Sequence, residues 1–102
     1  MYTWANNIFE RLLADPTLGA DLRARFSQAL QEQYKLESVL QLFDAMTTEV
    51  RPVVLRDERR WGADYTTYGG WSFRNDFLSA EQETAYLRQW IIDRWTFAAA
   101  VY

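Results

Sequence analysis

The stretch from Ser79 to Tyr102 reads SAEQETAYLRQWIIDRWTFAAAVY, and it predicts the clearest helix in the chain. Ser79 and Gln82 form a capping box, a pattern in which each side chain bonds the other residue's backbone N–H. Apolar residues then recur at helical spacing. The main ones are Leu87, Trp90, Ile91, Ala98 and Val101.

The apolar surface of this last helix is unusually wide, because Ile92, Trp95 and Phe97 extend it almost all round. Such a helix is either central in a domain or pressed against something else. A domain of about 100 residues can rarely enclose a helix on every side, so we expect one strip to stay exposed in a monomer. We expect the 63–77 segment, a second copy of the chain or a parent domain to cover it, with Trp71 and Trp95 nearest the cover.

Two helices are predicted near the N-terminus. The first is expected from Trp4 to Ala14, with Thr3 as its N-cap. Asp15-Pro16 then predicts the end of this helix and the beginning of the next. The residue before a proline is driven out of the helical region, and proline fits the first helical position. The second helix should bury one apolar stripe. This stripe consists of Leu18, Leu22, Phe26, Ala29 and Leu30.

A break is predicted near Gln33–Lys35, where the apolar stripe changes phase. A third helix is expected from Leu36 to Glu49, and a short further helix from Pro52 to Gly62 is favoured over a strand at VVL, residues 53–55. The apolar face of the third helix comprises Leu36, Val39, Leu40, Phe43, Met46 and Val50. Together these features predict one all-α domain over residues 1–102, a small bundle of four or five short helices with an aromatic-rich loop before the last helix.

That loop, ADYTTYGGWSFRNDF at 63–77, has five aromatic residues among fifteen. It could stack on a nucleic acid or sugar, hold a partner, or cover the chain's own core. A core lid that also serves as a partner surface is favoured, because the loop offers only Arg74 to a phosphate. The candidate interface residues are Tyr65, Tyr68, Trp71, Phe73, Trp90 and Trp95.

Arg94 falls inside the apolar stripe of the last helix. A buried guanidinium needs a carboxylate or carbonyl partner, because an unpaired buried charge is costly. We therefore predict that Arg94 is mostly buried and acts as a structural clamp.

Composition narrows the possible chemistry. The net charge is −3, which provides no basic field for nucleic acid. The chain has no Cys and no His, so thiolate nucleophiles and the commonest general base and metal ligand are missing. No stretch reaches the roughly 18 apolar residues of a membrane span, and the N-terminus does not resemble a signal peptide. We predict no catalytic, cofactor or metal residues and no nucleic-acid or membrane partner; the cellular compartment stays open.

Three segments occur in the order of one known family: IFERLLADPTLGADLRARFSQAL at 8–30, YKLESVLQLFDAMTTEVRPVVLRDERRW at 34–61, and YLRQWIIDRWTF at 86–97. They resemble the C-terminal helical portion of CotH-type proteins, the spore-coat-protein-H kinase family. In the last segment the similar positions are Leu87, Arg88, Trp90, Ile91 and Arg94.

This resemblance implies an atypical kinase whose ATP and divalent metal are bound upstream of this portion. The family's ATP-binding Lys and metal-binding Asp run have no counterpart here, so the resemblance implies a chain that is not an enzyme by itself. Its role would be structural support or protein interaction, with a protein partner, a parent domain or a second copy. The alternative is a stand-alone protein-binding module, such as a mobile-element inhibitor, that uses exposed Trp and Tyr residues.

Overall fold

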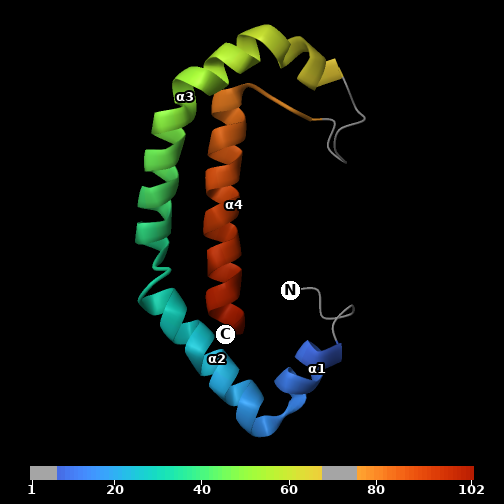
Figure 1. The fold of residues 1–102 in the computed structure, drawn as a ribbon, viewed down its shortest axis with the longest axis vertical. Coiled ribbons are helices and arrows are strands. Elements are labelled where there is room, and N and C mark those ends of the chain that lie inside the picture. The colour runs from blue at the N-terminus through green and yellow to red at the C-terminus, as the bar shows by residue number, and fades with distance from the viewer. Residues whose placement is uncertain (1–6, 68–75) are drawn as a thin grey trace.

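The computed structural model describes residues 7–67 and 76–102, and these form four α-helices with no strand among them. Figure 1 shows their order along the chain. The helices are α1 (Asn7–Ala14), α2 (Pro16–Gln31), α3 (Leu36–Thr67) and α4 (Ala80–Val101). The predicted all-α fold is confirmed, and Thr3 lies outside the described residues.

The junction of α1 and α2 is built by Asp15 and Pro16, as predicted. Asp15 has an extended backbone, and its carboxylate accepts the N–H groups of Thr17 and Leu18 at 2.9 and 2.8 Å. Pro16 occupies the first turn of α2, where its missing N–H costs nothing. The chain therefore ends one helix and starts the next within two residues.

Gly19 lets these two helices approach closely. It is buried, and a Cβ atom placed on it would lie 2.5 Å from the carbonyl oxygen of Leu13 in α1. Glycine lowers helix propensity in the first turns of α2, but here the missing side chain makes room for the end of α1.

The predicted break between the second and third helices is confirmed at residues 32–35. The N–H of Glu32 donates to the Gln28 carbonyl at 2.9 Å, and that of Tyr34 donates to the Ala29 carbonyl at 2.8 Å. These bonds satisfy carbonyls at the end of α2 before the chain turns into α3.

Pro52 lies inside α3, so the prediction of a separate helix from Pro52 to Gly62 is wrong. A proline removes only its own N–H bond, to the residue four positions earlier, and it can bend a helix without ending it. The hydroxyl of Thr48 donates to the Asp44 carbonyl at 2.7 Å in the preceding turn, a contact that also favours bending. Beyond Pro52, α3 changes direction, as Figure 1 shows. Gly62 continues the helix as an ordinary helical residue.

α4 runs antiparallel to the first part of α3 (Figure 1). Its capping box is confirmed: the Gln82 N–H donates to Ser79 Oγ at 3.3 Å, and the Ser79 N–H donates to Gln82 Oε1 at 3.2 Å. The far end of α4 reaches α2, where the rings of Phe26 and Tyr102 stack with centroids 4.9 Å apart.

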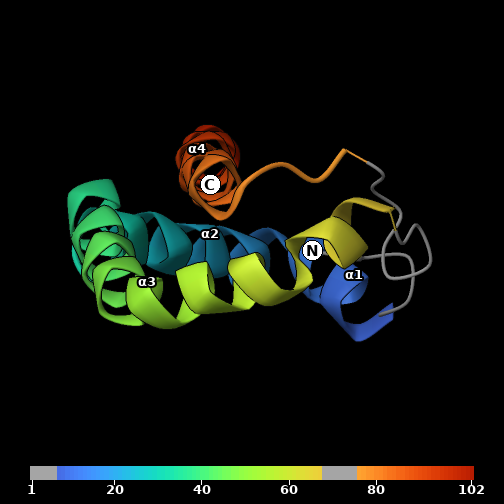
Figure 2. The same ribbon diagram turned by 90° about the horizontal axis from the view of Figure 1, so that it is seen from above.

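The whole molecule is an open arch (Figures 1 and 2). Its radius of gyration is 18.4 Å and its extents are 54 × 30 × 18 Å, whereas a compact domain of this length has a radius of gyration of about 13 Å. Among the described residues no hydrophobic side chain is buried. The helices therefore do not enclose a core, and much of the apolar surface of the chain stays open.

Candidate functional site

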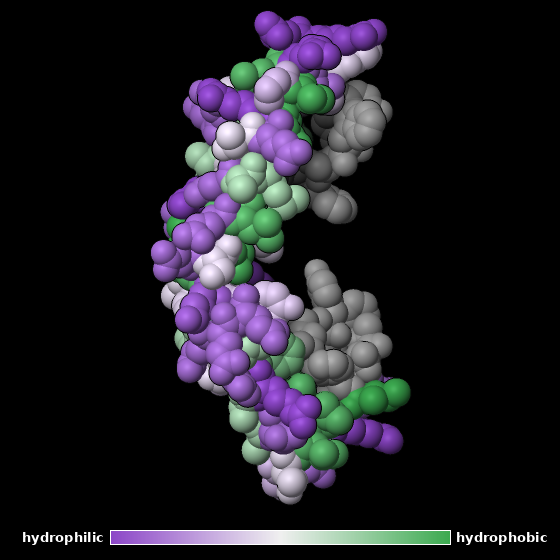
Figure 3. All heavy atoms as spheres, turned by 60° about the vertical axis from the view of Figure 1, so that its left-hand side comes forward, coloured by the Kyte–Doolittle hydropathy of each residue, from purple (hydrophilic) through white to green (hydrophobic). Residues whose placement is uncertain are grey.

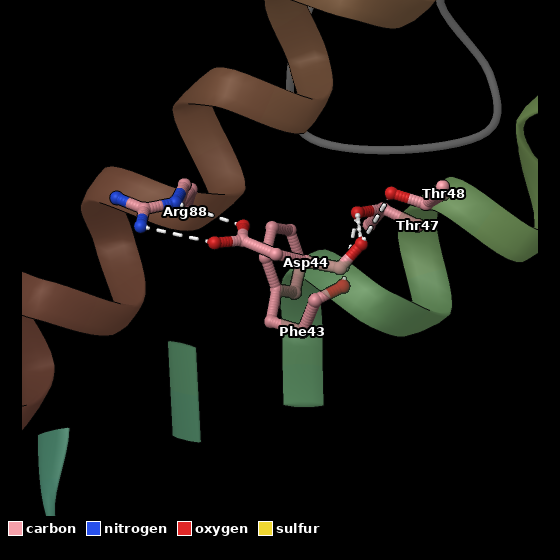
Figure 4. A network of polar contacts seen from close by, with 5 residues as sticks. All are labelled: Phe43, Asp44, Thr47, Thr48 and Arg88. Atoms are coloured by element: carbon pink, nitrogen blue, oxygen red, sulfur yellow. Dashed lines mark hydrogen bonds and ion pairs between the residues drawn. The ribbon is translucent and has the colours of Figure 1, made fainter. Parts of the chain in front are cut away.

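Two ion pairs hold α4 against α3. The guanidinium of Arg88 donates to both carboxylate oxygens of Asp44, at 2.9 and 3.1 Å, as Figure 4 shows. Arg51 pairs with Glu81 nearer the start of α4. The two residue numbers of each pair add to 132, so both pairs fit one register in which α3 and α4 run antiparallel.

The Arg88–Asp44 pair also shifts the ionisation of both groups. The hydrogen bond from Arg88 lowers the pKa of Asp44 below its ordinary 3.8, since the bond favours the charged carboxylate. The same bond raises the pKa of Arg88 above its ordinary value. Sequence reasoning missed this contact, because it depends on the register of two helices that are separated along the chain.

α4 carries an exposed apolar stripe on a side that does not contact α3. Its residues follow helical spacing and are 46–56% exposed. They are Tyr86, Leu87, Trp90, Phe97 and Val101. Ile91, Trp95 and Ala98, which are half-buried, lie about a third of a turn around the helix. The predicted exposed strip on the last helix is therefore present in this chain.

α3 carries a matching stripe in its first part. Leu42, Met46, Val50 and Val53 are 49–63% exposed and lie within a quarter of a turn of one another. The half-buried residues Leu40, Phe43 and Thr47 lie on an adjacent side of the helix. The sequence had predicted Met46 and Val50 to share the buried side, but only part of that apolar arc is covered.

The two stripes lie on the same side of the α3–α4 pair. Viewed along its own chain direction, each helix has its exposed stripe on the same rotational side of the residues that pack against the other helix. Because the helices are antiparallel, equal rotations bring both stripes to one side. The ion pairs of Arg88 and Arg51 lie towards the opposite edge of the contact. The shared register places Leu42 level with Trp90, and Met46 level with Tyr86.

We call this surface the α3/α4 face. Its members are large apolar side chains, each 46–63% exposed. They are Leu42, Met46, Val50, Val53, Tyr86, Leu87, Trp90, Phe97 and Val101. Figure 3 shows hydrophilic residues over most of the convex side, with hydrophobic residues gathered towards the concave side.

Arg94 lies within the apolar stripe of α4 and is exposed, so the prediction of a buried clamp is wrong. Its guanidinium lies over the ring of Phe97, 5.3 Å from the centroid. The physical reason is that the stripe of α4 containing Arg94 is not covered by another helix, and the guanidinium therefore keeps its water.

The other predicted interface residues lie apart from one another. Trp90 belongs to the α3/α4 face, whereas Trp95 is half-buried on another side and donates its Nε1–H to the Tyr34 carbonyl at 2.7 Å. Tyr65 lies in the last turns of α3, and its hydroxyl donates to Asp57 Oδ2 at 2.8 Å. That bond raises the pKa of Tyr65 above its ordinary 10.0. Tyr68, Trp71 and Phe73 lie outside the described residues.

A groove separates the second half of α3 from the start of α4. It consists of two adjoining pockets of about 470 and 310 Å³, which share Val54 and Ala80. The larger has an acidic rim that includes Asp57 and Glu58. Both carboxylates have partners in this chain, since Asp57 accepts from Tyr65 and Glu58 accepts the Ala80 N–H at 2.7 Å. Glu58 therefore helps to fix the α3–α4 junction, whereas the bond of Asp57 stays within α3.

Within residues 7–67 and 76–102, no three His, Cys, Asp or Glu side chains gather in a group that could hold a metal ion. None of the described helices is long and apolar enough to cross a membrane. No family model, curated protein or solved structure matches the chain.

Proposed function

We propose that this chain is a non-catalytic helical domain that works by binding protein through the α3/α4 face. One observation carries the proposal: nine large apolar side chains lie on one side of an ion-paired helix pair and stay 46–63% exposed. Covering such a surface stabilises a complex by about 25 cal/mol for each Å² of apolar area removed from water, before the cost of association.

The composition of the face also suits a protein partner. It contains Trp90, Tyr86, Phe97 and Met46, residue types that are enriched in the cores of protein interfaces. Trp and Tyr are frequent hot-spot residues, because one ring covers much area with few rotatable bonds. The helix pair beneath them is tied by the bidentate Arg88–Asp44 contact, which helps to hold the face in one arrangement.

Two roles fit such a face. The resemblance to the C-terminal helical portion of CotH-type proteins favours a structural role, in which a kinase-like parent domain would cover the face. The exposed rings of Trp90 and Tyr86 equally suit a stand-alone binding module, such as an inhibitor of another protein. Both roles use the same residues, so one experiment tests the shared proposal.

The test is binding of a hydrophobic dye to the dilute chain and to the variant Leu42→Glu/Trp90→Glu. We expect the wild-type chain to bind the dye and the variant to bind much less, because two charges then interrupt the face. Arg23→Glu, which changes an exposed residue of α2, is the control and should leave dye binding unchanged. Equal dye binding by all three chains would contradict the proposal.

A further inference from the structure

We propose that the partner covering the α3/α4 face is a second copy of this chain, in a two-fold symmetric dimer. This inference rests on the proposed function, since it names the occupant of the same face. Three observations support it: the area left open, the distribution of the apolar side chains, and the charges within the stripe of α4.

The whole chain exposes more surface than a compact monomer, and the excess is in the range that an obligate dimer buries. The chain exposes 8566 Å², whereas a compact monomer of 12.1 kDa exposes about 6,000 Å². The excess is about 2,500 Å² per chain, or about 5,000 Å² for two chains. Obligate homodimers bury about 2,000–5,000 Å² or more in total. A second copy could therefore supply the covered surface that this open arch lacks.

The shape of the face also suits contact with its own copy. A two-fold interface uses the same patch on both partners, so the patch must be complementary to itself. Two helices side by side, each with an apolar stripe, can pack against an identical pair as the layers of a four-helix bundle. The resulting core would contain Leu42, Met46, Trp90 and Phe97 from both copies, and it would replace the core that a single chain does not form.

Charges within the stripe of α4 favour the same arrangement. Glu83 and Arg94 are eleven residues apart, close to three helical turns, so they share one side of the helix, between Trp90 and Leu87 around its axis. When two copies of a helix cross antiparallel about a two-fold axis, equal sides meet. Glu83 of one copy would then lie beside Arg94 of the other, twice per dimer, with Trp90 of one near Leu87 of the other. Glu83 already accepts the Leu78 N–H at 3.0 Å, and a carboxylate can accept further bonds.

Light scattering and sedimentation on the purified chain across the micromolar range test the proposal. We expect twice the chain mass of 12.1 kDa. Trp90→Glu should weaken the dimer about 30-fold or more, as for a central interface residue, with unchanged helix content. Arg94→Glu should also weaken it, because Glu83 and residue 94 would then repel. Arg23→Glu changes the net charge equally and should not weaken it.

Disulfide formation tests the symmetry, because the chain has no native Cys. An oxidised mixture of Glu83→Cys and Arg94→Cys chains should give a cross-linked dimer. Either variant alone should give little, since identical positions would lie about 16 Å apart along the helices. A dimer that neither Trp90→Glu nor Arg94→Glu weakens would overturn the proposal. A dimer with the opposite cross-linking pattern would overturn the Glu83–Arg94 contact.

The two proposals fail in distinguishable ways. A monomer at every concentration, with dye binding that Leu42→Glu/Trp90→Glu removes, would overturn the second copy and leave the protein-binding face supported. A monomer whose dye binding those changes do not alter would remove both proposals.

Discussion

Gly19 shows how a single missing side chain positions two helices. The carbonyl oxygen of Leu13 occupies the space that a Cβ atom would need, and that oxygen belongs to backbone that no rotamer change can move. The geometry of the α1–α2 junction therefore depends on this glycine as well as on the Asp15 cap.

We expect Gly19→Ala to lower the free energy of unfolding by about 1–3 kcal/mol, the usual cost of overpacking, despite a gain of about 1 kcal/mol in helix propensity. Gly62→Ala is the matched control. Its Cβ would lie 3.5 Å from Glu58 Cγ, an ordinary contact, so the propensity gain should prevail and stability should rise. Urea unfolding of both variants checks the prediction, and a stabilised Gly19→Ala chain would contradict it.

The Asp44–Arg88 pair predicts a pH dependence. Because the folded pKa of Asp44 lies below its ordinary 3.8, its contribution to stability is present above that pH. The contribution is lost as the pH falls through the lower, folded pKa. We expect Asp44→Asn to reduce the melting temperature at neutral pH. The difference from wild type should shrink once the pH is well below 3.8, and a difference that stays constant with pH would refute the assignment.

At the scale of elements, the bend in α3 determines which part of this helix pairs with α4 and which part lines the groove. Its first part pairs with α4, while its second part, beyond Pro52, forms a wall of the groove. The change of direction at Pro52 separates these two roles. It also brings Glu58 to the start of α4, where its carboxylate accepts the Ala80 N–H.

We expect Pro52→Ala to straighten α3, because alanine restores the missing N–H and removes the clash of the ring with the preceding turn. Spin labels on Cys introduced at Gln41 and Asp64 report the change, with unlabelled chain added to suppress signals between copies. In Pro52→Ala their backbones should approach the roughly 35 Å of a straight helix over 23 residues. The chain with Pro52 should give a shorter distance. Equal distances would mean that another feature bends α3.

At the scale of the whole molecule, few contacts close the arch. The far end of α4 is held by the Phe26–Tyr102 stack and by the bond from Trp95 to the Tyr34 carbonyl. These contacts join α4 to α2 and to the turn before α3. These two contacts therefore fix the position of the end of α4 relative to α2, at the end of the arch opposite the groove.

We expect Trp95→Phe to cost about 0.5–1.5 kcal/mol of stability, the usual net value of one hydrogen bond, because phenylalanine keeps a ring but has no donor. Trp90→Phe is the control, since Trp90 lies in the exposed face and its loss of Nε1–H should change monomer stability little. Thermal unfolding at a concentration too low for self-association compares the two. Equal losses would show that the Trp95 bond has no special value.

Local signals predicted much of the secondary structure. The stop and start at Asp15-Pro16, the break before Leu36 and the capping box at Ser79 and Gln82 are all confirmed. Each depends on backbone and side-chain bonds that span five residues or fewer, so the sequence near each site contains the whole cause. Pro52 and Gly62 misled the prediction, because either residue can end a helix or stay inside it, and the neighbouring helix decides.

Local patterns were enough to predict an all-α chain, three of its helix boundaries, and an α4 with more apolar surface than one neighbour can cover. The placement of the helices against one another is what leaves Leu42 and Met46 open beside Trp90, pairs Arg88 with Asp44 and leaves Arg94 exposed. The physical reason is that helical periodicity fixes which residues share a side of one helix. Which side is covered depends on the register and direction of another helix about 40 residues away.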